Sequence, residues 1–233
     1  MALVNLEVIH EDNHLLVVNK PAGLLVQGDH SGDPTLNEKA KDYLREKYQK
    51  PGNVYIGLVH RLDRNVSGVV VLARTSKAAS RLSASFRDKK VLKIYRAVIA
   101  GSPPEPNGDL VAWLGAKGDS RGVTRASNQS FDGARESLLN YKVLETQGEF
   151  SLLEISPITG RRHQIRAQLA LVGCPLVGDV KYGSPMRLPD HRIALHALKL
   201  EFKHPVKAGL VGYEASVPES FPWPPRLLSE RNR

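Results

Sequence analysis

A short charged segment in the first third of the chain carries the best candidate for chemistry. The residues His60-Arg61-Leu62-Asp63-Arg64 place one carboxylate among three basic side chains, and the apolar run Val69 to Ala73 follows closely. Neighbouring cations lower the pKa of a carboxyl group and keep it ionised. A loop that leads into a strand is also a place where a scaffold holds a side chain rigidly. Asp63 is therefore the first candidate catalytic residue, and the alternative is an aspartate in an ordinary polar turn.

A second basic segment, Thr159 to Gly173, has the pattern of a short helix that Thr159 caps and Gly173 ends. Arg162 and Arg166 are four residues apart, so they would project together from the helix. Two arginines at the start of a helix oppose its dipole. That cost is easier to understand if an anion, a phosphate or a carboxylate, lies beside them. The alternative is an ordinary solvated pair of arginines.

Two further side chains have an open role. Tyr95 lies in a predicted strand, Val91 to Ala100, where it shares a face with Lys93 and Ala97 because side chains alternate across a strand. A single tyrosine in such a strand is a site residue or a core residue. Lys20 precedes a bend at Pro21, and it either faces a functional cleft or is a solvated lysine before a turn.

The N-terminal region contains a formal match to a zinc-protease motif, His10-Glu11-Asp12-Asn13-His14. Zinc chemistry would need a helix that puts both histidines on one face. Here the motif separates two β-rich runs, which favours a strand, a polar turn and a second strand. A zinc hydrolase is therefore only a distant alternative, and we expect no metal and no cofactor.

The composition is that of an ordinary globular protein of 233 residues, with 41% hydrophobic and 24% charged residues. No apolar run has the length of a membrane span and no secretory signal is visible, so we expect a cytoplasmic protein without a membrane partner. The single cysteine, Cys174, excludes an internal disulfide and a thiolate zinc cluster. A formal net charge of +9 suits a polyanionic partner, and RNA or DNA is the expected one.

Strands and helices alternate along most of the chain. A Thr35–Glu38 capping box predicts a helix up to Tyr48. Apolar side chains at helical spacing predict a second helix, Ser76 to Asp88. The segment 101–130 is rich in Pro, Gly, Ser and Asn, which indicates long loops around short strands. A hairpin is expected from Ser137 to Ser156, with its turn at Gln147 to Glu149.

Four separate segments together resemble the signature motifs of the RluA class of pseudouridine synthases. His60 to Gly68 is similar to HRLDxxTSG, Lys93 to Ala97 to KxYxA, Thr159 to Arg166 to TGRxHQIR, and Leu176 to Gly183 to LGDxxYG. The resemblance extends over roughly residues 8 to 205, nearly the whole chain. It implies an α/β (α+β) pseudouridine synthase fold, with a bent, mainly antiparallel mixed sheet, flanking helices and a central RNA-binding cleft.

The resemblance implies an RNA uridine isomerase that acts on structured RNA, ribosomal or transfer. Asp63 matches the family's essential aspartate, Tyr95 would stack on the uracil, and Arg166 would pair with Asp63. The route, through a covalent adduct or a glycal, stays open. Because the target base must be flipped out of its helix, Arg61 is a candidate to fill the vacated space. The candidate substrate-binding residues are His60, Arg61, Arg64, Arg162, His163, Gln164, Ile165 and Leu195. For Ile165 and Leu195, core packing is the alternative.

Two positions depart from the family pattern. Val66 stands where threonine is usual, and Gln168 stands where histidine is common. We expect one catalytic domain over residues 1–233, without a separate N-terminal RNA-binding domain, and a monomer. The alternative function is a non-catalytic module that binds or folds RNA on the same scaffold. The intact set of Asp63, Tyr95 and Arg166 favours the enzyme, because such a module has no chemical need of all three.

Overall fold

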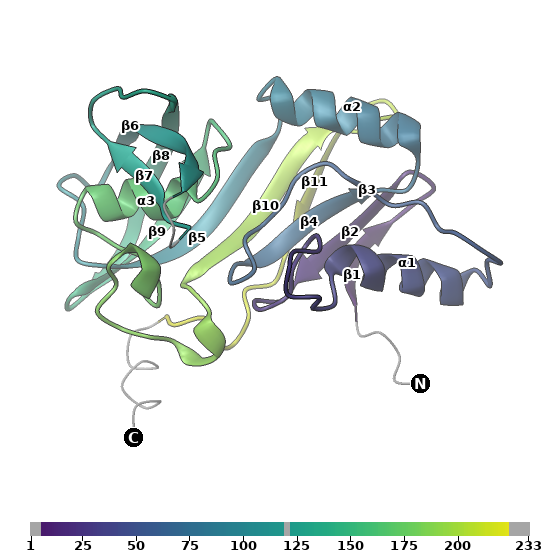
Figure 1. The fold of residues 1–233 in the computed structure, drawn as a ribbon, viewed down its shortest axis with the longest axis horizontal. Helices are drawn as coiled ribbons and strands as arrows, with labels where there is room; N and C mark the ends of the chain where they lie inside the picture. Colours follow the sequence, from purple (N-terminus) through teal and green to yellow (C-terminus); the bar gives the residue numbers. More distant parts are fainter. Residues whose placement is uncertain (1–5, 119–121, 224–233) are drawn as a thin grey trace. The chain divides into compact units, whose positions relative to one another are not determined.

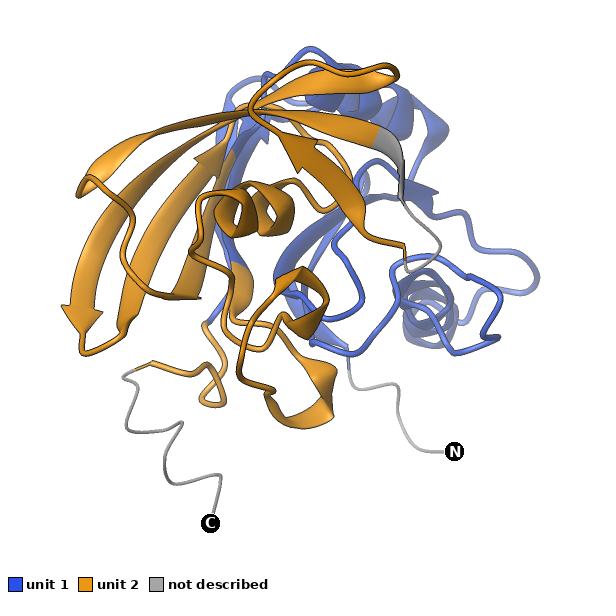
Figure 2. Cartoon of the chain, turned by 60° about the vertical axis from the view of Figure 1, so that its left-hand side comes forward, with its two compact units in different colours: residues 1–92, 197–216 blue, residues 93–196, 217–233 orange. Residues whose placement is uncertain are grey.

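The structure is a computed structural model that describes residues 6–118 and 122–223. Figure 1 shows its elements, and Figure 2 shows the two compact units into which the chain divides. Unit 1 comprises residues 1–92 and 197–216, and unit 2 comprises residues 93–196 and 217–233. The chain therefore passes from unit 1 to unit 2 after Leu92, returns after His196 and leaves again after Ser216. The single catalytic domain expected from the sequence stays a prediction.

Unit 1 is built on antiparallel strands. Its strand order is β1 (Glu7–Glu11), β2 (Leu15–Lys20), β4 (Ser67–Ala73) and β10 (Leu195–Lys203), while β3 (Gly57–Leu58) pairs with β4 and β11 (Leu210–Glu214) with β10. Strands β2 and β4 are buried along their whole length, which explains their continuous apolar sequences. Their register pairs Leu15 with Ala73 and Lys20 with Gly68. The end of β2 therefore lies beside the start of β4, where the charged segment enters the sheet.

The two predicted helices of unit 1 are confirmed. Helix α1 (Leu36–Lys47) begins at Thr35, whose side chain accepts a hydrogen bond from the Glu38 N–H while the Glu38 side chain accepts one from the Thr35 N–H. This is the capping box expected from the sequence. Helix α2 (Ser76–Arg87) is capped by Thr75 and packs on β3 and β4. The two helices bury apolar stripes against the core of unit 1.

Unit 2 contains a second run of antiparallel strands. Their order is β5 (Leu92–Ala100), β9 (Phe150–Pro157), β8 (Ala134–Gln147), β6 (Asn107–Gly118) and β7 (Thr124–Ser127). The β8–β9 hairpin confirms the predicted one. The expectation of short strands between long loops over residues 101–130 is wrong, because β6 runs for 12 residues. Strand β6 pairs with β8 from Asn107–Lys142 to Gly115–Ala134. This pairing stabilises a strand that its glycines and polar residues made hard to recognise in the sequence.

Helix α3 (Gln164–Leu171) packs on β6 and β7 of unit 2. It is followed by two short 3₁₀ helices, η1 (Val180–Tyr182) and η2 (Pro189–His191). One buried cluster of this unit joins Ala112, Leu114, Ala167 and Tyr182, so α3 and η1 share a core with β6. Over residues 6–118 and 122–223, no helix is long and apolar enough to cross a membrane.

Candidate active site

The loop that carries Asp63 is fixed where it enters unit 1. The Asp63 carbonyl accepts the N–H of Val66 at 3.1 Å, which closes a turn directly before β4. Gly68 follows at φ 121°, and a Cβ there would overlap the backbone of Ala197 in β10. Glycine is thus required for β4 and β10 to approach so closely. The half-buried Asp63 side chain lies on a loop with little freedom to shift.

Lys20 is buried beside this loop. Its side chain is fully buried, and its ammonium donates to the carbonyls of Pro21 (2.9 Å), Leu24 (2.8 Å) and Arg64 (3.2 Å). Three acceptors match the three donors of an ammonium group. Burial lowers the pKa of Lys20 to about 7, and the negative charge of Asp63 opposes that shift. The alternative of a solvated lysine is therefore wrong, and Lys20 joins the two loops while placing positive charge near Asp63.

The arginines on either side of the Asp63 motif are exposed. Arg64 is nevertheless tied to its own unit, because its Nε donates to the Gly23 carbonyl at 3.0 Å and its Nη1 lies 2.7 Å from Asp33 Oδ2. The Arg64 carbonyl also accepts the N–H of Gly23 at 2.8 Å. Arg61 and Arg64 are thus available to a polyanion at the surface of unit 1, with Arg64 the more restrained of the two.

His60 is held by contacts inside unit 1. Its Nε2 accepts the N–H of Val71 at 3.0 Å, and its ring stacks on Phe86 with centroids 4.6 Å apart and planes at 16°. Because Nε2 accepts, a neutral His60 carries its proton on Nδ1. These contacts join the motif loop to β4 and α2, which favours a positioning role for His60 over a substrate-binding one.

Arg166 lies in unit 2, where a carboxylate holds it. The Arg166 side chain is 7% exposed and forms a two-point ion pair with Asp179, with Nε to Oδ2 at 2.7 Å and Nη2 to Oδ1 at 2.8 Å. The ring centroid of Tyr182 lies 4.8 Å from its guanidinium carbon. Asp179 and Tyr182 belong to the segment that resembles LGDxxYG, so two motifs of the sequence meet at this arginine.

The segment before α3 differs from the predicted helix. The helix begins at Gln164, and His163 precedes it in the left-handed conformation with φ 52°. Thr159 does not cap it: the Thr159 hydroxyl donates to Gln164 Oε1 at 2.7 Å and accepts the Leu138 N–H at 3.0 Å. Arg162 therefore lies outside the helix, and the predicted shared face with Arg166 is wrong. The turn forms because Gln164 bonds to its own loop and to β8, an arrangement that helical spacing cannot reveal.

The remaining predicted residues of unit 2 have different environments. Tyr95 is half-buried in β5 opposite Ile155 of β9. Ile165 and Leu195 are 7% and 4% exposed, so core packing is sufficient to explain the burial of both residues. Gln164 Nε2 donates to the Leu138 carbonyl of β8 at 3.1 Å, and its Oε1 accepts hydrogen bonds from Thr159 and Arg161 in its own loop. The exposed Arg162 and the half-buried His163 contact Gly122 and Tyr182, respectively.

The two departures from the family pattern fit their surroundings. Val66 is buried at 2% exposure, so its apolar side chain packs where a threonine hydroxyl would need a partner. Gln168 is also buried, and its Nε2 donates to the carbonyls of Leu110 (2.7 Å) and Ser137 (3.1 Å). Gln168 thereby connects α3 with β6 and β8. Neither residue belongs to the predicted catalytic set.

Sequence reasoning missed two residues of this region. In the sequence Asp179 is only one residue of a motif, and Lys20 fits two roles equally well. The signals that could have found them were the charge of Asp179 shortly after the apolar residues Leu176 and Val177 and the position of Lys20 at the end of a mainly apolar strand. Among the residues that the structure describes, no group of three or more His, Cys, Asp or Glu side chains is placed to hold a metal ion.

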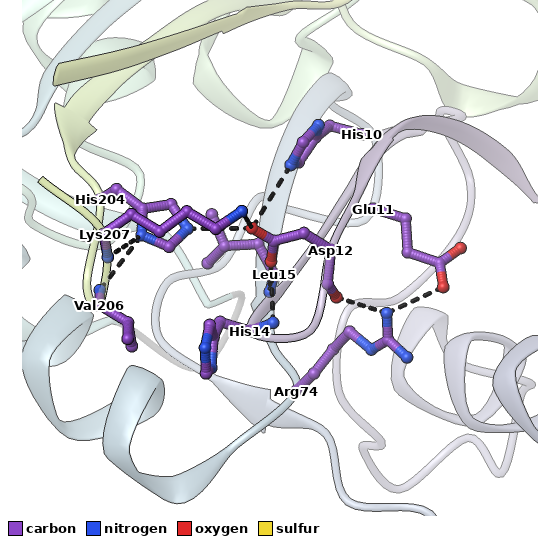
Figure 3. Close-up of polar contacts among 9 residues, drawn as sticks. All are labelled: His10, Glu11, Asp12, His14, Leu15, Arg74, His204, Val206 and Lys207. Atoms are coloured by element: carbon purple, nitrogen blue, oxygen red, sulfur yellow. Dashed lines mark hydrogen bonds and ion pairs between the residues drawn. The ribbon is translucent and has the colours of Figure 1, made fainter. Parts of the chain in front are cut away.

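The zinc-like motif folds as a hairpin rather than a helix. His10 belongs to β1, and Asp12 Oδ1 accepts the N–H groups of His14 and Leu15, both at 2.8 Å (Figure 3). Asp12 thus shapes the turn between β1 and β2, as an aspartate in a tight turn commonly does. The zinc interpretation is wrong because the helix it needs does not form.

The turn is also joined to the end of β10. Asp12 Oδ2 lies 3.1 Å from His204 Nε2 and 2.7 Å from Lys207 Nζ (Figure 3). His204 Nδ1 accepts the N–H groups of Val206 and Lys207, so the proton of this buried histidine is on Nε2 and is donated to Asp12. Burial would raise the pKa of Asp12, but the hydrogen bond from Lys207 and those from the backbone hold it well below its ordinary value.

Glu11, which a zinc protease would use as its base, is also engaged. Its carboxylate accepts hydrogen bonds from Tyr43, Lys47, Tyr48 and Arg74. Burial alone would raise the pKa of Glu11, and the hydrogen bonds from Lys47 and Tyr48 outweigh it, so the pKa lies below its ordinary value. Glu11 is therefore an anchor between β1 and α1.

Comparisons with known proteins agree on one family. Residues 14–171 match the model of the family described as RNA pseudouridylate synthase. Ribosomal large subunit pseudouridine synthase D of Pseudomonas aeruginosa is 33% identical over 97% of this chain and 73% of its own length. Ribosomal large subunit pseudouridine synthase C of Rickettsia prowazekii is 32% identical over 92% and 69%. The solved structure of human RNA Pseudouridylate Synthase Domain Containing 4 covers 94% of this chain and 91% of its own, with a TM-score of 0.78 and 25% identity. This likeness confirms the expected fold class.

Proposed function

The chain belongs to the RNA pseudouridylate synthase family, and we propose that it converts uridine to pseudouridine in large-subunit ribosomal RNA, with Asp63 as its catalytic carboxylate. Its relatives support the choice of ribosomal over transfer RNA, because those cited above are named for the ribosomal large subunit. Family membership favours an isomerase over the non-catalytic RNA-binding module.

The reaction is an isomerisation. The bond between N1 of uracil and C1′ of ribose breaks, the base turns, and C5 bonds to C1′; C5 then loses a proton and N1 gains one. No electrons enter or leave. A carboxylate such as Asp63 can attack C1′ or stabilise positive charge that develops there, and both roles need the ionised form.

The observation that carries the proposal is the environment of Asp63. The carboxylate lies on a loop braced by Lys20, which donates to the Arg64 carbonyl at 3.2 Å next to Asp63 in the chain. All three ammonium donors of Lys20 go to carbonyl groups, so Lys20 acts on Asp63 through its charge rather than through a hydrogen bond. Lys20 therefore braces the loop of Asp63 and places positive charge near its carboxylate.

Tyr95 and Arg166 complete the proposed catalytic set. An aromatic ring offers a flat face on which any base can stack. Tyr95 is half-buried and not fully buried in the core. An arginine can pair with a carboxylate and fix its orientation. In the proposal Tyr95 stacks on the uracil and Arg166 pairs with the Asp63 carboxylate. The phosphates of the RNA are bound by Arg61, Arg64 and Arg162.

The test is pseudouridine formation by Asp63→Asn in ribosomal RNA transcribed in vitro. We expect a rate loss of about 10⁴-fold or more, the scale seen when a central catalytic group is removed, with RNA affinity largely retained. The matched control is Asp42→Asn, which makes the same chemical change in an exposed pair with Arg45 and should stay within about threefold of the wild type. Substantial pseudouridine formation by Asp63→Asn would refute the assignment.

The identity of the target is a separate question. Mapping pseudouridine across cellular RNA, with and without the gene, should show one or a few uridines that lose the modification. A wild-type protein that binds RNA but forms no pseudouridine would favour the non-catalytic module. The monomeric state and the cytoplasmic location stay predictions, which light scattering and cell fractionation would test.

A further inference from the structure

The pair between Arg166 and Asp179 is an unusual place for two charges. The side chains of Asp179 and Arg166 are 1% and 7% exposed, so both ions have left water. Taking an ion pair out of water is costly, and an apolar pair of similar volume is often at least as stabilising. Stability of the fold is therefore a weak explanation for this pair. A requirement for a guanidinium in one orientation explains it better.

We propose that Asp179 is a positioning residue for the isomerisation, because its carboxylate fixes the plane and direction of the Arg166 guanidinium. The inference rests on the proposed function of Arg166. Asp179 binds the guanidinium from its side, through Nε and Nη2 at 2.7 and 2.8 Å. The Nη1 group takes no part in that pair, and the rigid planar fork then determines where its two N–H groups point.

The loop that carries Asp179 is itself rigid. Gly178 has φ 86°, and a Cβ there would lie 2.6 Å from the Arg192 carbonyl oxygen, so only glycine fits. The Asp179 N–H donates to the Leu176 carbonyl at 3.0 Å, and its own carbonyl accepts the N–H groups of Tyr182 (2.9 Å) and Ser184 (3.1 Å). The carboxylate therefore cannot shift unless the whole turn does.

Tyr182 restrains the same guanidinium in a second direction. Its ring centroid is 4.8 Å from Arg166 Cζ, while its hydroxyl accepts the Thr124 N–H at 2.8 Å and lies 2.8 Å from His163 Nδ1. The ring is thus fixed from β7 and from the turn before α3. Carboxylate and ring together restrict both the rotation and the tilt of Arg166, which is the arrangement that a group orienting a catalytic carboxylate needs.

The first test is kinetic and uses Asp179→Asn. We expect kcat for pseudouridine formation to fall about 100-fold with KM within about threefold, since a displacement of about 1 Å costs that much in rate. The control Asp190→Asn removes a carboxylate of the same unit that is 80% exposed and pairs with Arg192, and it should leave kcat unchanged. A folded Asp179→Asn with wild-type kcat would overturn the proposal.

The second test separates positioning from a role of Asp179 by itself. If Asp179 acts through Arg166, then Asp179→Asn should cost less than about threefold further in an Arg166→Met background. A full additional loss of about 100-fold in that background would contradict the proposal. If Asp179→Asn does not fold, Asp179→Glu keeps the charge but displaces it by one methylene, and a folded Asp179→Glu with wild-type kcat would count equally against it.

A third measurement does not depend on activity. The Arg166 Nε–H, bonded to a buried carboxylate, should exchange slowly with solvent and give a resolved ¹⁵N NMR signal that exchanges much faster in Asp179→Asn. A wild-type protein that forms no pseudouridine would refute the proposed function, and with it the role of Asp179 in the isomerisation, even if the Arg166 Nε–H is protected. A wild-type Arg166 Nε–H without protection would refute the positioning role alone.

Discussion

The two units each bury one cation, and they satisfy it in opposite ways. In unit 1 the fully buried Lys20 ammonium is surrounded by three backbone carbonyls, and Asp63 acts on it only as a nearby charge. In unit 2 the Arg166 guanidinium meets a carboxylate, Asp179, at two points. Both cations lie next to motif loops, so the difference concerns chemistry rather than burial.

The difference shows that a buried charged group can act through its electrostatic field or through the fixed orientation of its side chain. Carbonyl dipoles solvate the Lys20 charge without cancelling it, so its field can act on Asp63. The pair with Asp179 largely neutralises Arg166 but fixes its plane. Lys20 should therefore act near Asp63 as a charge, whereas Asp179 should control the orientation of Arg166. Two stability measurements would test this contrast, and a third would extend it to the turn around Asp12.

The largest effect is expected at the ion pair of unit 2. Arg166→Met leaves the Asp179 carboxylate buried without this partner, which should lower the free energy of unfolding by about 3–5 kcal/mol. The double variant Arg166→Met/Asp179→Leu creates an apolar pair and should regain most of that loss. Urea denaturation of both variants is the measurement. A single variant as stable as the wild type would show that the pair is not energetically coupled.

The pH dependence of stability should reveal the lowered pKa of Lys20. Its pKa is about 7 in the folded chain and 10.5 when unperturbed. Between these values the unfolded chain binds more protons than the folded one, so this residue makes stability rise with pH by about 1 kcal/mol per unit. The slope fades as the pH falls through 7, because Lys20 is then protonated in both states. The difference in unfolding free energy between wild type and Lys20→Met should therefore grow by about 2 kcal/mol from pH 7.5 to 9.5. A constant difference would mean that the Lys20 pKa is not lowered.

The turn around Asp12 offers a third, smaller case. Its pKa is lowered from 3.8, since hydrogen bonds from Lys207 and the backbone outweigh burial. Asp12→Ala should cost about 2 kcal/mol at pH 7, the scale of hydrogen bonds to a charged group. Because a depressed carboxyl pKa stabilises only above the unfolded value, the cost should shrink as pH falls below 3.8. The control Asp42→Ala changes an exposed ion pair. It should alter stability by less than about 0.5 kcal/mol both at pH 7 and below pH 3.8.

Predictions from the sequence held where the signal was local. The capping box of Thr35 and Glu38 needs only residues three apart, and it formed as expected. The hairpin of β8 and β9 likewise follows from alternation on both sides of a short turn. Strand β6 was missed because its residues pair with residues of β8 that are 19 (Gly115 and Ala134) to 35 (Asn107 and Lys142) positions further on, and this pairing overrides its weak strand propensity. The start of α3 was predicted too early in the chain. The side chain of Gln164 bonds to Leu138 of β8, and the residues before Gln164 form a turn instead of helix.

The sequence by itself determined the family, the motif loops and most strands and helices, because spacing and local propensity encode them. It also singled out Asp63, Tyr95 and Arg166 as the candidate catalytic set, through resemblance. Only the tertiary structure decided which groups stand beside Lys20, Arg166 and Asp12. Asp179 is 13 residues from Arg166, and His204 is 192 residues from Asp12. Such partners meet because burial and strand pairing bring distant segments together, and the pKa of a buried group depends on what it then meets.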